Sequence, residues 1–86
     1  MPEISRFLGI IIYMYFNEHS PPHFHARYNE YQAAIFIESL GIVQGNLPSK
    51  VLSLVVEWAM EHKQELLDNW ESLQATGKYR KIKPLV

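Results

Sequence analysis

Histidines gather in one short stretch of this chain, NEHSPPHFHARY at residues 17–28. His19, His23 and His25 follow the pattern H-x-x-x-H-x-H, and imidazole nitrogens are common ligands of zinc and other divalent transition metals. His23 and His25 are two residues apart, so both point to the same face if they lie on a strand. The stretch therefore predicts a histidine-lined site, and a divalent metal ion such as zinc is one candidate occupant.

A carboxylate oxygen would suit such a metal site. Glu18 directly precedes His19, and Glu38 lies farther along the chain, at a distance that a hairpin would close. Between His19 and the other two histidines, Pro21 and Pro22 form a stiff corner, across which the chain can fold back. A position left open for water would make the site reactive. The predicted metal ligands are His19, His23, His25, Glu18 and Glu38.

The same three histidines could also work without a metal. Imidazoles titrate near neutral pH, so they can serve as base and acid on a ribose-phosphate bond, with Arg27 or Tyr13 holding the phosphate. Tyrosines and Phe36 would then stack on the bases of single-stranded RNA. A purely structural role is the third alternative, because histidines beside prolines often hydrogen-bond to loop backbone. The residue types leave all three open.

Composition restricts the class of protein. The 86 residues carry a net charge of −1, and 48% of them are hydrophobic, which suits one compact domain. The chain has no cysteine, which excludes disulfides and thiolate zinc sites and favours a cytoplasmic location. Its longest apolar run, FLGIIIYMYF at residues 7–16, is far shorter than the roughly 20 residues of a membrane span, so no membrane contact is expected.

Four segments have the residue types of β-strands. Phe7–Phe16 is apolar on both faces and predicts a central strand. His23–Tyr28 and Tyr31–Glu38 predict a hairpin around a turn at Asn29-Glu30, and Ile42–Gln44 predicts a short fourth strand. The first half of the chain is therefore expected to form a small antiparallel sheet.

A two-residue turn would set the register of this hairpin, with His25 facing Ala34 and His23 facing Phe36. Glu38 would lie one pair beyond His23. One face of the hairpin is then apolar and consists of Phe24, Ala26, Ala33, Ile35 and Ile37. The other face carries His23, His25, Arg27, Gln32, Ala34, Phe36 and Glu38.

Beyond Pro48, apolar residues recur every three or four positions, which predicts one amphipathic helix that ends at Gly77. Pro48 suits the first turn of a helix, and Gly77 suits the position just past its last residue. The length of this segment leaves a break near His62–Gln64 open. Trp58 and Trp70 are predicted to pack in the core, with a groove for a partner as the alternative.

The order of these elements predicts an α+β fold. A small antiparallel sheet of three to four strands in residues 1–45 would precede one long helix, continuous or broken, in residues 46–77, packed on one face. Residues 78–86 form a basic tail that holds half of the eight Lys and Arg residues, and it is interpreted as a solubilising segment or a phosphate-binding arm. Together, residues 1–86 are expected to form a single domain.

Several segments are shared with a known family: PEISRFLGIIIYMYFNEHSPPHFHARY, then GNLP, EWA–EH–ELLDNW and KIKPL. Over nearly its whole length the chain resembles a small, widespread bacterial domain of unknown function. The hallmark of that family, acidic-His-x-Pro-Pro-His-Phe-His, maps onto Glu18, His19, Pro21, Pro22, His23, Phe24 and His25. Members look like stand-alone genes, frequently beside a second small domain, so the resemblance implies a toxin–antitoxin-like or regulatory pair.

The leading hypothesis is a cytoplasmic bacterial accessory protein of toxin–antitoxin type whose histidines bind a divalent metal or cleave RNA. The alternative is a non-catalytic interaction module, acting with a paired small protein or as a homo-oligomer, through an open sheet edge or the tryptophan-bearing helix. Sequence-specific DNA binding is not expected. The chain has no helix-turn-helix pattern, and the exposed side of its helix is acidic and would repel a phosphate backbone.

Overall fold

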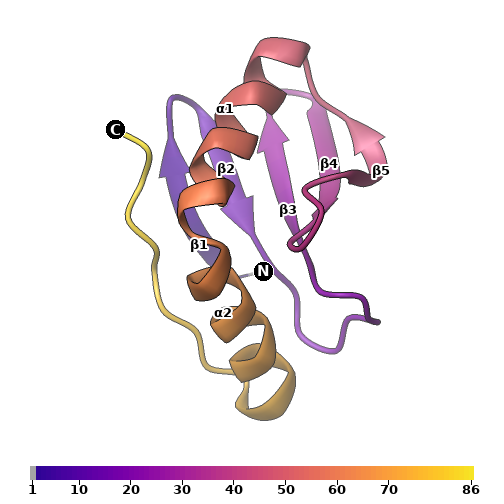
Figure 1. The fold of residues 1–86 in the computed structure, drawn as a ribbon, viewed down its shortest axis with the longest axis vertical. Helices are drawn as coiled ribbons and strands as arrows, with labels where there is room; N and C mark the ends of the chain where they lie inside the picture. Colours follow the sequence, from indigo (N-terminus) through magenta and orange to yellow (C-terminus); the bar gives the residue numbers. More distant parts are fainter. Residues whose placement is uncertain (1) are drawn as a thin grey trace.

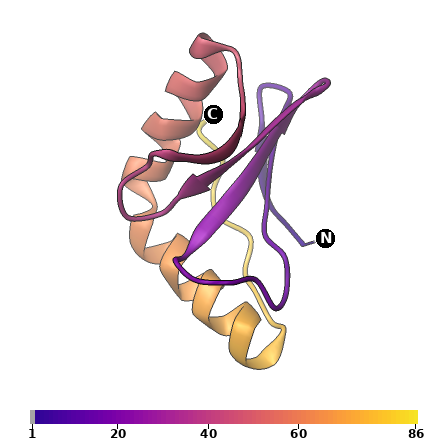
Figure 2. The same cartoon turned by 90° about the vertical axis from the view of Figure 1, so that its right-hand side faces the viewer.

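The computed structural model describes residues 2–86 and has an α+β fold in two layers (Figure 1). Five strands form one antiparallel sheet, in the order β1-β2-β3-β4-β5. Two helices lie across one face of this sheet and leave the opposite face open (Figure 2). The elements are β1 (Glu3–Phe7), β2 (Ile10–Tyr13), β3 (His23–Tyr28), β4 (Tyr31–Phe36), β5 (Ile42–Asn46), α1 (Ser49–Glu61) and α2 (Lys63–Thr76).

The prediction of a single central strand at Phe7–Phe16 is wrong, because this run folds into the β1–β2 hairpin. Phe7 and Ile10 pair directly across a two-residue turn, in which Leu8 and Gly9 have φ angles of 52° and 79°. Gly9 enters the left-handed region easily, whereas Leu8 does so at a cost of about 1 kcal/mol. Apart from Gly9 the run has no turn residue. The sheet therefore has five strands, not the three to four expected.

The predicted register of the β3–β4 hairpin is confirmed, since His25 pairs with Ala34 and His23 pairs with Phe36. Asn29 has a φ of 53° in the two-residue turn, a conformation that asparagine tolerates better than most residues. The apolar face predicted for this hairpin is buried under the helices: Phe24, Ala26, Ala33, Ile35 and Ile37. The histidines therefore lie on the open face.

β4 ends earlier than predicted, at Phe36. The N–H of Leu40 donates to the carbonyl of Phe36 at 2.9 Å and closes a turn, so Glu38 lies in that turn and not on the strand. β5 is longer than the predicted Ile42–Gln44 segment. Its residue Gly45 has a φ of 83°, and a Cβ atom there would lie 2.3 Å from a carbonyl oxygen of β4, so only glycine fits.

The helical segment consists of two helices, not one, and the break at His62 falls inside the predicted interval. A straight helix from Ser49 to Thr76 would be about 42 Å long at 1.5 Å per residue. The longest extent of the molecule is 34 Å, so an unbroken straight helix would be longer than the molecule itself. The His62 ring packs on Trp58, and its Nδ1 lies 2.6 Å from a carboxylate oxygen of Glu65 in the first turn of α2.

Both tryptophans lie in the core, as predicted: Trp58 is fully buried and Trp70 nearly so. The predicted end of the helical segment is confirmed as well, because Gly77 takes the left-handed conformation and its N–H donates to the carbonyl of Leu73. Pro48 immediately precedes α1 and does not lie within its first turn. Within residues 2–86 no helix is long and apolar enough to cross a lipid bilayer.

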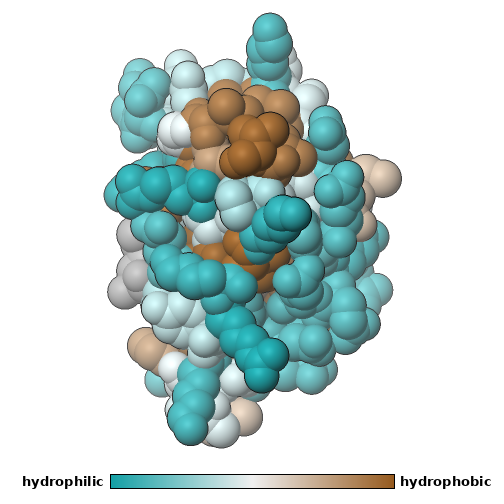
Figure 3. Space-filling model, turned by 90° about the vertical axis from the view of Figure 1, so that its left-hand side faces the viewer, coloured by the Kyte–Doolittle hydropathy of each residue, from teal (hydrophilic) through white to brown (hydrophobic). Residues whose placement is uncertain are grey.

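Residues 78–86 lie along the outer edge of β1 as an ordered strap (Figure 1). The buried Ile82 donates its N–H to the carbonyl of Ile4 at 2.9 Å, and the Trp58 indole N–H donates to the carbonyl of Lys83 at 2.8 Å. Figure 3 shows the side of the molecule that lies at the left in Figure 1. There, hydrophilic side chains surround hydrophobic areas that gather mainly in the upper half of the view. The basic tail is therefore part of the packed structure.

Candidate functional site

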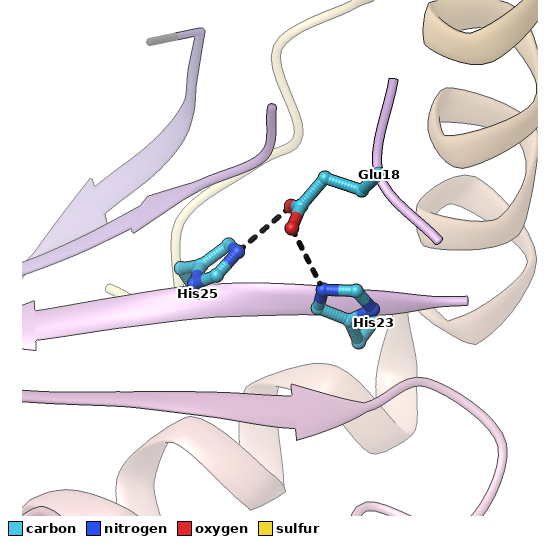
Figure 4. Close-up of side chains that lie close together, drawn as sticks. All are labelled: Glu18, His23 and His25. Carbon is cyan, nitrogen blue, oxygen red and sulfur yellow. Dashed lines mark hydrogen bonds and ion pairs between the residues drawn. The ribbon is translucent and has the colours of Figure 1, made fainter. Parts of the chain in front are cut away.

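Glu18, His23 and His25 converge at one end of the open face (Figure 4). β3 presents both histidines from alternate positions, and Glu18 comes from the loop that joins β2 to β3. Its two carboxylate oxygens lie 3.1 Å from Nε2 of His23 and 2.8 Å from Nε2 of His25. One potential ligand atom of each residue lies within 4.8 Å of the others. The side chains are 13–19% exposed, so water and small solutes can reach a largely enclosed site.

Gln74 on α2 holds the loop that carries Glu18. Its side-chain oxygen accepts the N–H of Glu18 at 3.0 Å, and its side-chain nitrogen donates to the carbonyl of Tyr15 at 3.3 Å. One amide thus fixes the loop at two points. No pattern in the sequence points to this residue, because its role depends on how a distant loop packs against the helix.

The hydrogen bonds of His23 determine where its hydrogen lies. Nδ1 is 2.9 Å from the carbonyl oxygen of Pro21, which can only accept, so Nδ1 carries the hydrogen. In a neutral imidazole, Nε2 then has a lone pair, and this lone pair faces a carboxylate oxygen of Glu18 at 3.1 Å. Two electron-rich atoms at this distance require a positive charge between them, either a proton or a metal ion.

Aromatic rings hold both imidazoles in place. The ring of His25 stacks on Tyr13, with centroids 5.1 Å apart and planes at 14°, and meets Tyr15 edge-on at 4.9 Å. The ring of His23 packs on Trp70 at 5.1 Å, which links the site to the core through α2. The histidine side chains are therefore oriented before any ligand binds.

The other predicted site residues lie outside this group. His19 is exposed in the loop, and Glu38 is exposed in the turn after β4, where its backbone oxygen accepts from the Lys63 ammonium at 2.6 Å. Arg27 is exposed on the open face, two residues beyond His25 on β3. Among the described residues, the structure thus brings together three of the five predicted metal ligands. The roles predicted for His19, Glu38 and Arg27 stay predictions.

The surface of residues 2–86 has hollows, of which one lies beside α2 and another on the open face. The larger, of about 780 Å³, lies between α2 and the tail and contains none of the predicted site residues. The smaller, of about 260 Å³, lies on the open face and has His25 in its wall. Tyr13 also lines it. Its hydroxyl donates to Gln32 at 3.4 Å, and burial raises the pKa of this hydroxyl. Size alone favours the first hollow, but the second adjoins the candidate ligands.

Comparison with protein families matches residues 9–71 to a domain of unknown function, DUF4160. No curated protein and no solved structure matches the chain. The matched segment covers most of the sequence and includes Glu18, His23 and His25, so the resemblance to a small family of unknown function is confirmed. The chain belongs to the DUF4160 domain family.

Proposed function

We propose that this protein binds one divalent transition-metal ion through Glu18, His23 and His25 and that it is a metal-dependent hydrolase. The observation that carries the proposal is the orientation of His23. Its Nδ1–H is held by a backbone carbonyl, and its Nε2 is directed at a carboxylate oxygen, so a positive charge belongs between the two atoms. This is the arrangement in which proteins commonly prepare a histidine for a metal, with the outer nitrogen fixed by a second hydrogen bond.

The spacing of the ligand atoms supports the same proposal. In a tetrahedral site with bonds of 2.0–2.1 Å, neighbouring ligand atoms are about 3.3 Å apart. The two nitrogen–oxygen distances, 3.1 and 2.8 Å, run to different oxygens of Glu18, and one ligand atom from each residue lies within 4.8 Å of the others. A small shift of the side chains would therefore bring three ligand atoms to the spacing that an ion needs. Two histidines and one carboxylate leave coordination positions open, which is typical of catalytic zinc and of non-haem iron sites.

Acid–base catalysis by the imidazoles alone is less well supported. Such catalysis requires a ring nitrogen that can exchange a proton with the substrate. Here the Nε2 atoms of His23 and His25 both face Glu18 and Nδ1 of His23 faces the carbonyl of Pro21, so three of the four ring nitrogens are already engaged. A bound divalent ion supplies Lewis acidity and activates water at neutral pH, and the chain's residues would hold and orient it.

The direct test is metal content by plasma emission on untagged protein purified without chelators. We expect near-stoichiometric zinc, iron, manganese or another divalent transition metal in the wild type, and loss of that metal in His23→Ala, His25→Ala and Glu18→Gln. His19→Ala is the matched control, because His19 lies in the same stretch but outside the group, and it should keep the metal. A wild type that stays metal-free after incubation with these ions contradicts the proposal, as does equal loss in the control.

A second candidate function, a non-catalytic interaction module, is supported by the exposed edge strand β5. All five of its residues are exposed, none is charged, and Ile42 and Val43 are more than 40% exposed. Such an edge can pair with a strand of a partner or a second copy. Val43→Pro would remove one backbone donor from this edge. Light scattering and co-purification should then show loss of assembly in Val43→Pro and retention in His25→Ala; the reverse pattern contradicts this role.

The wider role stays a prediction: a cytoplasmic accessory protein of a bacterial toxin–antitoxin-like or regulatory pair, acting beside a second small protein. Its support is the histidine cluster in a small, cysteine-free domain together with the resemblance described above. Induced expression with and without the neighbouring gene, for wild type and His25→Ala, would test it. Equal growth in all four strains would contradict a role in such a pair that depends on this site.

A further inference from the structure

We infer that the Glu18–His23–His25 site is one half of a nucleotide-binding site, in which the base occupies the adjoining hollow and the phosphate lies at the metal. The phosphate half rests on the proposed function. The base half rests on the hollow alone, so the two can be tested separately.

The hollow is continuous with the metal site because His25 belongs to both. Tyr13 on β2 and Ala34 on β4 are the cross-strand neighbours of His25, and Gln44 on β5 is the next neighbour of Ala34. The hollow thus extends from the candidate ligands across the open face toward β5. Its volume is about 260 Å³, and it is lined by Tyr13, Tyr15, His25, Gln32, Ala33, Ala34, Gln44 and Gly45.

The lining suits an uncharged, planar, heteroaromatic ring. Tyr15, which is 39% exposed, offers aromatic surface on which a base can stack, while the ring of Tyr13 already stacks on His25 and forms part of the wall. Ala34 and the glycine in β5 have small or no side chains, which gives the hollow its depth. The carboxamides of Gln32 and Gln44 can donate to and accept from the edge of a base, as glutamine does with adenine. None of the lining residues is an acid, lysine or arginine, so the hollow itself does not select for charge.

A positive charge is also available on the open face. Arg27 lies two residues beyond His25 on β3, is exposed, and pairs across the sheet with Gln32, which lines the hollow. Arg27 is therefore the neighbour of a lining residue, whereas the phosphate itself would be held at the metal site.

The acidic residues of the helices do not line the hollow. Glu57, Glu61, Glu65, Asp68 and Glu71 belong to α1 and α2, which cover the other face of the sheet, although α2 also reaches the metal site through Trp70 and Gln74 (Figure 2). The base in such a hollow must be unpaired, because a paired base in a duplex cannot enter it.

The binding test uses the full-length protein loaded with zinc and isothermal titration calorimetry. The probes are adenosine, adenosine 5′-monophosphate, inorganic phosphate and a single-stranded oligoadenylate. We expect the monophosphate to bind about tenfold or more tightly than either adenosine or phosphate, as when two subsites hold one ligand. Tighter binding of the oligoadenylate than of the monophosphate would identify a nucleic-acid strand as the source of the nucleotide, and equal binding would identify a free nucleotide.

Two variants change residues that line the hollow and leave the metal ligands themselves unsubstituted. Ala34→Leu fills its floor and should weaken adenosine and monophosphate binding about tenfold or more, the lower range for loss of one stacked base. Gln44→Ala removes one carboxamide and should weaken both by a smaller factor. Gln64→Ala, an exposed glutamine on α2, is the matched control and should bind like the wild type. Metal content should be unchanged in all three.

The outcomes separate the two claims. Monophosphate binding that is no tighter than phosphate binding, or that is unchanged in Ala34→Leu, would overturn the inference and leave the metal proposal standing. Conversely, a protein that binds no metal but binds adenosine in a manner sensitive to Ala34→Leu would confirm the base subsite and overturn both the metal proposal and the phosphate half.

Discussion

The two faces of the sheet use adjacent residues of β3 in opposite ways. Phe24 is fully buried and meets the ring of Trp58 edge-on, with centroids 6.2 Å apart. His25, the next residue, points to the open face, where it contacts Glu18 and Tyr13. Because strand side chains alternate, one six-residue strand contributes both to the core and to the site. Stability and site chemistry should therefore respond to different substitutions on the same strand.

The largest expected effect is the contrast between Phe24→Ala and His25→Ala. Phe24→Ala leaves a cavity under α1 and should lower the free energy of unfolding by about 3–5 kcal/mol, a large part of the stability of a domain this small. His25→Ala should cost far less and abolish metal binding. Urea unfolding followed by circular dichroism measures the first quantity, and plasma emission the second. Equal destabilisation by both would show that the two faces are not separable.

Gln74→Ala should give an intermediate effect, because Gln74 connects the helix layer to the site. Loss of its two hydrogen bonds to the β2–β3 loop should lower the free energy of unfolding by about 1–2 kcal/mol. It should also weaken metal binding by about 10–100-fold, as when a group that supports a ligand is removed. Competition with a chelator gives the affinity. If Gln64→Ala, on the same helix, changed affinity equally, the tether would not be the cause.

Ser5→Ala should raise stability. Ser5 pairs with Ile12 on the helix-covered face, is nearly buried, and its hydroxyl has no hydrogen-bond partner within residues 2–86. Removing a buried, unsatisfied hydroxyl should increase the free energy of unfolding by about 1 kcal/mol. Thermal unfolding of the two proteins is a sufficient measurement. A lower midpoint in Ser5→Ala would mean that the covered face tolerates polar groups better than its burial indicates.

The smallest effect concerns an exposed ion pair at the β1 edge. A hydrogen bond from Arg6 lowers the pKa of Glu3, with Lys81 adding to it. The Glu3 carboxylate binds a proton more readily in the unfolded chain than in the folded protein. The ion pair therefore stabilises the folded protein at pH values above the usual glutamate pKa, and this contribution is lost as the pH falls through the lowered pKa of the folded state. Glu3→Gln should shift the unfolding midpoint slightly at neutral pH and not at pH 2–3, and less in high salt. A shift that persists at low pH would contradict an electrostatic origin.

Local patterns predicted the parts of the fold that depend on them. Alternation along β3 and β4, with Asn29 in the turn, was enough to predict the register in which His25 pairs with Ala34. The hairpin at Leu8 was not predictable from residue type, because leucine rarely occupies a positive φ. The length of the helical segment left a break near His62–Gln64 open, and the structure places it at His62.

The candidate site was predictable in its histidines and less so in its geometry. Same-face placement of His23 and His25 follows from their spacing on a strand. Which carboxylate joins them depends on the path of the β2–β3 loop, and this path depends on Gln74, which lies far away in sequence. The prediction that Glu38 is a metal ligand assumed that β4 continues to Glu38. The strand ends two residues earlier, at Phe36, where the chain turns. The choice of carboxylate thus depends on tertiary contacts, which the periodicity of the sequence does not reveal.

The strap along β1 has a consequence for self-association. Each molecule has two sheet edges, and residues 78–86 occupy one of them through Ile82, so β5 is the edge left for pairing. If two copies pair through β5, neither copy keeps an unpaired sheet edge. Growth into a filament requires two adhesive edges on every subunit, and here polymerisation stops at a closed pair.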